Sequence, residues 1–159
     1  MLVAIATQNS KLSTLNSPNC MFTAKVYNVM VGSLSGIMEE VFAVREVIRQ
    51  WNQQHAQASC RVLLPAEWTT APAALDATDV VIALVDNWVG DTRAIDHCIA
   101  AGKHVILLFN AFADPGNTIE SEHQAVAAFR ERVQSHCRCL EYRGTVQLKQ
   151  RMEEAIGEI

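Results

Sequence analysis

The unbroken apolar stretch Val80–Val85 (VVIALV) decides the fold. A strand with one face in water alternates apolar and polar residues, whereas a strand covered on both faces does not alternate. The stretch His104–Phe109 (HVILLF) has the same character, and Thr92–Ala101 between them suits a short helix that ends at Gly102. The segment predicts a strand, a helix and a second strand of a parallel sheet.

Strands and helices also alternate toward the N-terminal side. Val26–Val31 (VYNVMV) favours a strand, and the small residues of Gly32–Gly36 lead into a helix that we expect over residues 37–55. Apolar residues recur in that helix at steps of three and four, which is typical of one buried helix face. A short strand follows over Arg61–Leu64 and is expected to stop at Pro65.

The C-terminal side repeats the pattern. Turn residues at 114–116 precede a polar helix at about 118–135, a strand at 138–142 and a last helix from Gly144 to about Ile156. Alternating strands and helices predict βαβ units with right-handed crossovers. We expect a three-layer αβα fold with a mostly parallel five-stranded sheet in the flavodoxin-like order 2-1-3-4-5.

Length and composition restrict the class of protein. The chain has 159 residues, which suggests one domain that we place at residues 25–159, after an arm (1–24) that is either disordered or an added edge strand. The net charge is −4 and basic residues are scattered, which argues against nucleic acid as a partner. No apolar run approaches the ~20 residues that span a membrane, and no secretory signal opens the chain, so the expected location is the cytoplasm.

The five cysteines form no CxxC pair, so neither a disulfide framework nor a metal site is expected. Cys137 and Cys139 lie beside His136, but zinc would need further ligands that the neighbouring sequence does not supply. Ordinary buried thiols are the expectation for this pair.

Ligands of such sheets bind outside the carboxyl ends of the strands, near the switch point between the first and third strands. The first loop there offers Gly32, Ser33 and Ser35 ahead of a helix whose free N–H groups favour a phosphate or carboxylate. The alternative is a tight turn in which one of the serines caps the helix. The second loop offers Trp68 to stack on a base and Glu67 to bind ribose hydroxyls; alternatively, Trp68 only covers the sheet edge and Glu67 is solvated.

The third loop is unusually polar for the end of a core strand. Asp86, Asn87 and Trp88 are candidate ligand-binding residues. Asp91 and Asp96 are candidate catalytic carboxylates for acid/base work. The alternative for Asp91 is an N-cap of the following helix, which is a common role of Asp at that position.

Five short motifs occur in a fixed order between residues 26 and 156. They are Val29–Ser35, Val44–Ile48 with Trp51-Asn52, Val62–Trp68, Asp79–Val85 with Gly90, and Ala101–Val105. In this order they resemble a bacterial TIR-like family related to the nucleoside deoxyribosyltransferase fold, whose members occur alone or ahead of signalling ATPase modules.

This resemblance implies a pocket for a nucleotide-like ligand, with NAD as a substrate or ligand and no other cofactor. It also implies cleavage of an N-glycosidic bond. In the family, a carboxylate on the helix after the third strand stabilises the ribosyl cation or forms a covalent ribosyl intermediate while the base leaves.

The chain departs from the family at that carboxylate. The family's Glu-Glu positions fall on Arg93 and Ala94, and the segments before the third strand and after Gly90 are short, which is expected to remove the second-strand helix and part of the active-site loop. Asp91 or Asp96 would have to substitute. A shift of one helical turn moves a group by about 5 Å, whereas reacting groups must lie within about 3.5 Å.

Two hypotheses follow. The favoured one is a non-catalytic or weakly active TIR-like domain that binds a nucleotide-type ligand, forms a homo-oligomer, or does both, with an apolar surface exposed where the second-strand helix is missing. The alternative is an NAD or nucleoside N-glycosidase or ribosyltransferase that uses Asp91 or Asp96.

Overall fold

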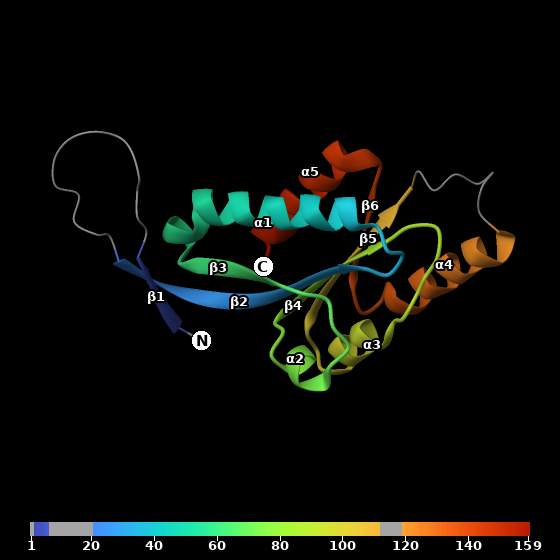
Figure 1. Ribbon diagram of the computed structural model, residues 1–159, viewed down its shortest axis with the longest axis horizontal. Helices are drawn as coiled ribbons and strands as arrows, with labels where there is room; N and C mark the ends of the chain where they lie inside the picture. Colours follow the sequence, from blue (N-terminus) through green and yellow to red (C-terminus); the bar gives the residue numbers. More distant parts are fainter. Residues whose placement is uncertain (1, 7–20, 112–118) are drawn as a thin grey trace.

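A computed structural model of the chain describes residues 2–6, 21–111 and 119–159, in which strands and helices alternate (Figure 1). In chain order the elements are β1 (Leu2–Ala6), β2 (Met21–Ser33), α1 (Met38–Ser59), β3 (Arg61–Ala66), α2 (Pro72–Asp76), β4 (Val80–Val85), α3 (Arg93–Ala100), β5 (His104–Asn110), α4 (Glu120–Val133), β6 (Arg138–Tyr142) and α5 (Gly144–Gly157).

The core of the sheet is five parallel strands in the order β3-β2-β4-β5-β6. Counted from β2, this is the order 2-1-3-4-5, so the predicted flavodoxin-like topology is confirmed. β1 is an addition that pairs antiparallel with the first residues of β2. Lys25 pairs with both Leu2 and Arg61, so β1 and β3 flank opposite edges of β2 at that point. Residues 7–20 of the expected arm lie outside the described part.

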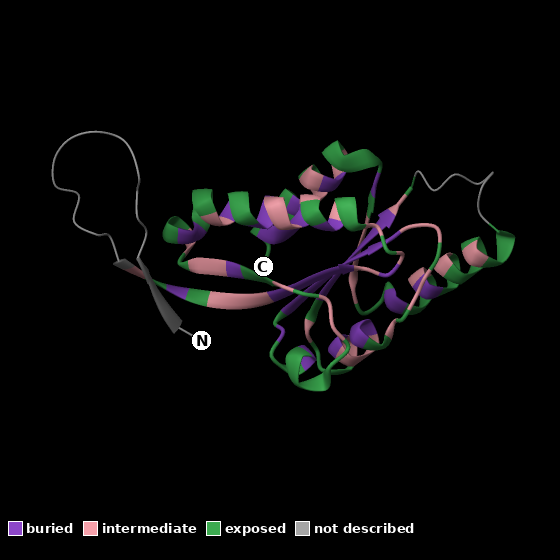
Figure 2. Ribbon diagram, viewed as in Figure 1, coloured by how far each residue is buried: buried purple, intermediate pink, exposed green. Residues whose placement is uncertain are grey.

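Helices cover both faces of the sheet, which confirms the three-layer arrangement. α1 and α5 lie over one face, and α2, α3 and α4 lie over the other (Figure 1). Every residue of β4 is buried, as its unbroken apolar sequence predicts for a central strand (Figure 2).

Two strands are longer than their sequences predict. β2 begins at Met21 because β1 provides a partner for its first residues. β3 continues through Pro65, which lies opposite Val29 in the register. Proline is tolerated there because β3 is an edge strand, where a missing N–H breaks no bond to a further strand.

The prediction that the second-strand helix is absent is wrong. α2 is short, but its Leu75 is 2% exposed. It packs with Met30 and Val81 in the second core cluster, which lies between the sheet and the helices α2, α3 and α4. α2 therefore covers the part of the sheet face around Met30 and Val81, where we expected an apolar dimer surface, whereas Leu64 and Pro65 on the edge strand β3 stay exposed. Within the described ranges, no helix combines the length and the apolar character that a membrane span requires.

Candidate functional site

The loops after β2 and β4 meet at the carboxyl edge of the sheet and hydrogen-bond to each other. The Gly90 N–H donates to the Leu34 carbonyl (2.9 Å). The Ser35 hydroxyl accepts from the Asp86 N–H (2.8 Å) and donates to the Trp88 carbonyl. Ser35 therefore uses its hydroxyl to join two loops of the protein.

The hydroxyl of Ser33 lies in the turn that leads into α1. It accepts from the N–H groups of Ser35 (3.1 Å) and Ile37 (3.0 Å). The first turn of α1 also carries Glu39 and Glu40, and carboxylates at a helix N-terminus disfavour a bound phosphate. The tight turn of the structural alternative is therefore present, but the N-cap residue of α1 is Ile37 and no side chain of the described residues caps the helix.

Trp68 fills the crevice at the switch point. A Cβ atom on Gly32 would lie 2.4 Å from Cε3 of Trp68, so the indole rests directly on the β2 backbone. Glu67 is exposed and pairs with Arg45 (2.6 Å), which also donates to the Ala66 carbonyl (3.3 Å). The hydrogen bond from Arg45 lowers the pKa of Glu67. Trp68 thus covers the sheet, as in the alternative to base stacking. Glu67 forms an ion pair with Arg45 of α1.

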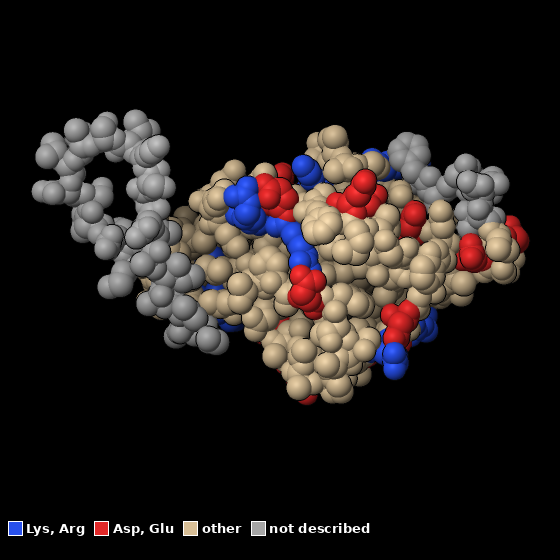
Figure 3. Space-filling view, in the orientation of Figure 1, with Lys and Arg blue, Asp and Glu red and all other residues tan. Residues whose placement is uncertain are grey.

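Both candidate catalytic carboxylates have arginine partners. Asp91 accepts from the backbone N–H (3.0 Å) and Nε (2.9 Å) of Arg93, whose side chain lowers the pKa of Asp91 to about 2. Asp96 accepts from the Thr92 hydroxyl (2.8 Å) and from Arg132 on α4 (2.5 Å). Asp91, which precedes the N-cap residue Thr92, therefore forms a local turn with the first residue of α3, and Asp96 links α3 to α4. On the face seen in Figure 3, several basic side chains likewise lie against acidic ones, while other acidic side chains stand apart.

A cavity of about 210 Å³ lies at the carboxyl ends of β4 and β5, beside α4. Its walls are Asp86, Phe109, Asn110, Ala111, His123, Val126, Ala127, Arg130 and Glu141. Asp86 accepts from the Asn110 amide (3.0 Å), and Arg130 pairs with Glu141. Asp86 was predicted for this edge, whereas Asn110 and Arg130 were missed. Asn110 could have been proposed from the sequence, because it is a polar residue that directly follows the apolar run His104–Phe109.

Two buried polar atoms near this edge have no hydrogen-bond partner among the described residues, Oδ1 of Asn87 and the hydroxyl of Tyr142. Burial raises the pKa of Tyr142, and the carboxylates of Glu40 and Asp86 raise it further. Trp88, which follows Asn87 in the sequence, is 45% exposed. A polar ligand group that reached either atom would therefore gain a hydrogen bond.

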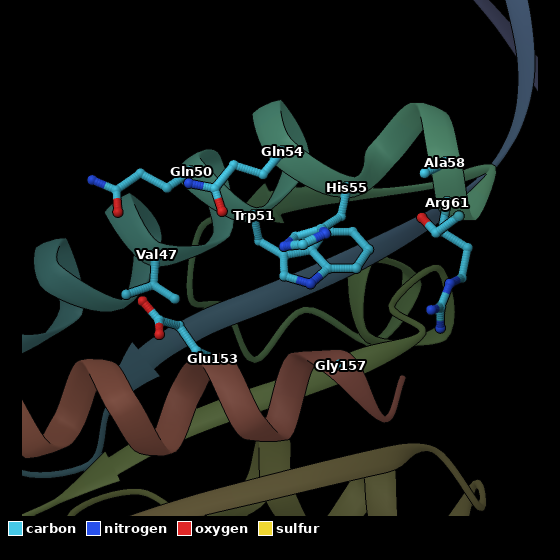
Figure 4. A pocket seen from close by; sticks show the side chains of 10 residues that line it. Val47, Gln50, Trp51, Gln54, His55, Ala58, Arg61, Glu153 and Gly157 are labelled. Carbon is cyan, nitrogen blue, oxygen red and sulfur yellow. The ribbon is translucent and has the colours of Figure 1, made fainter.

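A larger cavity, of about 550 Å³, lies between α1 and α5 at the opposite end of the sheet (Figure 4). We call it the α1–α5 groove. Its walls are Val47, Gln50, Trp51, Gln54, His55, Ala58, Ser59, Arg61, Glu153 and Gly157. None of these was a predicted site residue. The described residues contain no cluster of three or more potential metal ligands.

The strand order and the two helix layers define the class of protein, a flavodoxin-like three-layer α/β domain. No family model and no curated protein sequence matches the chain. Among solved structures, a short-chain flavodoxin associated with a non-canonical PDU bacterial microcompartment is similar, at 9% identity over 84% of this chain and 97% of that one, with a TM-score of 0.47. The assignment of the fold depends on the strand order of this chain itself.

Proposed function

We propose that the chain is a TIR-like domain that binds a nucleotide-type ligand without cleaving it. The observation that carries the proposal is the pairing of Asp91 with Arg93 and of Asp96 with Arg132. Cleavage of an N-glycosidic bond needs a carboxylate that faces the ribosyl cation. A carboxylate whose charge is already compensated by a guanidinium stabilises that cation less.

The positions at which the family carries its glutamates support the same proposal. Ala94 is fully buried in the second core cluster and has no polar side chain. Arg93 is turned back onto Asp91. A cation at this position would repel a developing ribosyl cation.

The carboxyl-edge cavity is the proposed ligand site. Asp86 and Asn110 offer an acceptor and a hydrogen-bonding amide of the kind that bind ribose hydroxyls or base edges. Trp88 is not part of the cavity wall, but it follows Asp86 on the same loop and offers a half-exposed ring for stacking. The cavity is smaller than the ~300 Å³ at which ligand pockets usually begin, so it suits one part of a nucleotide, a base or a ribose.

The test has two arms. Calorimetry with NAD and a set of nucleosides measures binding, and we expect binding that Asn110→Ala weakens and that the control Arg151→Gln, outside the walls of the cavity, leaves unchanged. Chromatography of the same mixtures measures base release, and we expect none. Base release that Asp91→Ala or Asp96→Ala abolishes would instead support the glycosidase or ribosyltransferase alternative.

Self-association is a second candidate function, and two residues of α1 favour it. Met38 and Phe42 are one helical turn apart and are 53% and 61% exposed, which is unusual for two neighbouring large apolar side chains. We propose that they contact a second copy in a homo-oligomer. Light scattering should then give a mass above that of the monomer, and Phe42→Glu should reduce it. A wild-type monomer at high concentration would refute this contact.

A further inference from the structure

Arg61, at one end of the α1–α5 groove, has no carboxylate partner in the described part of the chain. Ion pairs with Asp or Glu are formed by seven other arginines: Arg45, Arg49, Arg93, Arg130, Arg132, Arg138 and Arg151. The guanidinium of Arg61 instead lies 5.7 Å from the ring centroid of Trp51. An unpaired guanidinium at the wall of a cavity is a site for an anionic group.

The ring of Trp51 lies next to this guanidinium, and the ring of His55 lies next to that of Trp51. Trp51 and His55 project from α1 into the space between α1 and α5 (Figure 4), with ring centroids 5.5 Å apart and a tilt of 40°. Trp51 is 9% exposed and forms the floor, whereas His55 is exposed. Gln54, also on the wall, adds an amide that can donate and accept. Together these groups suit a planar ring with polar edges.

The groove has opposite charges at its two ends. Glu153 of α5 lies beside Val47, at the end away from Arg61 (Figure 4). An anionic group is therefore repelled from one end and attracted to the other, which orients a ligand along the groove. The hydroxyl of Ser59, buried in this wall with no partner among the described residues, is a further donor near Arg61.

The C-terminal end of α1 also lies near Arg61. Its free carbonyl groups carry a negative partial charge of about half an elementary charge. This partial charge accounts for a guanidinium that is stable there without a carboxylate. The same helix end repels a bound anion, but the charge-assisted bonds between the anion and the guanidinium are stronger than this repulsion.

We propose that the α1–α5 groove binds a planar molecule that carries one anionic group, with Arg61 binding the anion and Trp51 and His55 contacting the ring. The volume of about 550 Å³ lies within the ~300–1,000 Å³ typical of small-molecule sites. Two sources share this chemistry, an aromatic carboxylate and a nucleoside monophosphate. This site is separate from the carboxyl-edge site of the proposed function.

The test is a titration of the full chain with indole-3-acetate and with AMP, followed by NMR of the backbone amides and the tryptophan indole N–H groups. We expect one of the two probes to shift the Trp51 indole signal, and the responding probe identifies the source. The neutral molecules indole and adenosine should bind more weakly. Arg61→Gln should weaken binding by about tenfold or more, whereas Arg151→Gln, a change of the same chemistry outside the groove, should not.

A second variant tests the place of binding without removing a charge. A Cβ atom on Gly157 would have no neighbour within 4 Å, so Gly157→Leu is expected to fold and to fill the groove. It should abolish the shifts while the circular dichroism spectrum stays unchanged. The proposal is overturned if neither probe shifts Trp51, or if Arg61→Gln and Gly157→Leu both leave binding intact. Shifts confined to Asp86 and Asn110 would overturn it as well, while supporting the carboxyl-edge site.

Discussion

At the scale of single residues, Gly32 is the described glycine at which an added Cβ atom would make the shortest contact. Its missing side chain lets the Trp68 indole rest on β2, and a Cβ atom there would overlap the ring. Because the ring must shift from a half-buried position, we expect Gly32→Ala to lower the free energy of unfolding by about 1–3 kcal/mol.

Urea denaturation measures this change, and Gly157→Ala is the matched control, since a Cβ atom there has open space. If Trp68 is the cause, Gly32→Ala should cost much less in a Trp68→Ala background than in the wild type. Equal costs in the two backgrounds would contradict the assignment.

The pKa of Asp91 gives a second prediction at this scale. Its hydrogen bonds with the Arg93 side chain hold the folded-state value at about 2, below the ordinary value of about 3.9. Since the folded-state pKa is lowered, the pair contributes stability above about pH 4, and this contribution is lost as the pH falls toward 2. An NMR titration of the Asp91 carboxyl group should show the low midpoint in the wild type and a higher midpoint in Arg93→Gln, which keeps only the backbone hydrogen bond from residue 93. A wild-type midpoint near 3.9 would show that the pair does not form in solution.

The residues of the candidate site were only partly predictable from sequence. A local role of Asp91 at the start of α3 could be predicted, because Asp is common there, although the N-cap residue is Thr92. Asp96 could not be assigned a partner, because Arg132 is distant in sequence and belongs to another helix. No sequence pattern pointed to Arg61 as a binding residue, because its proposed role depends on the absence of a carboxylate from its three-dimensional surroundings.

At the scale of elements, Ser35 determines how the loops after β2 and β4 hold each other. Its hydroxyl makes one bond to each of two neighbouring backbone positions, Asp86 and Trp88. Ser35→Ala leaves both groups without this partner, so we expect a loss of about 1–2 kcal/mol in the free energy of unfolding.

Hydrogen exchange locates the effect of Ser35→Ala. The Asp86 amide should exchange faster in the variant, while amides in the middle of β4 should change only with global stability. Ser121→Ala, at an exposed position of α4, is the control. An unchanged Asp86 amide would mean that the loops are held together by their other bonds.

Element boundaries show where sequence patterns lose precision. The central strand β4 has the predicted bounds, because an unbroken apolar run identifies a strand covered on both faces. The ends of β2 and β3 differ because they depend on neighbours: β1 extends β2, and the edge position of β3 makes Pro65 tolerable. No local pattern contains this information.

At the scale of the whole molecule, the topology was predictable and the larger cavity was not. Alternating elements and right-handed crossovers leave few arrangements of a parallel sheet. The α1–α5 groove, in contrast, forms where two helices from opposite ends of the chain pack together. The α1 residues that line the groove recur at steps of three and four. This spacing is typical of a buried helix face, so the sequence predicted core packing there and not a cavity.

The central claim is that this domain binds a nucleotide-type ligand and leaves it intact. The most direct test is incubation of the purified protein with NAD and nucleosides at neutral pH, with chromatography of the released base. We expect base release no greater than in a protein-free control, in mixtures for which calorimetry detects binding. Release that is catalytic in the wild type and lost in Asp96→Ala or Asp91→Ala would contradict it, because one of these arginine-paired carboxylates would then be performing the cleavage.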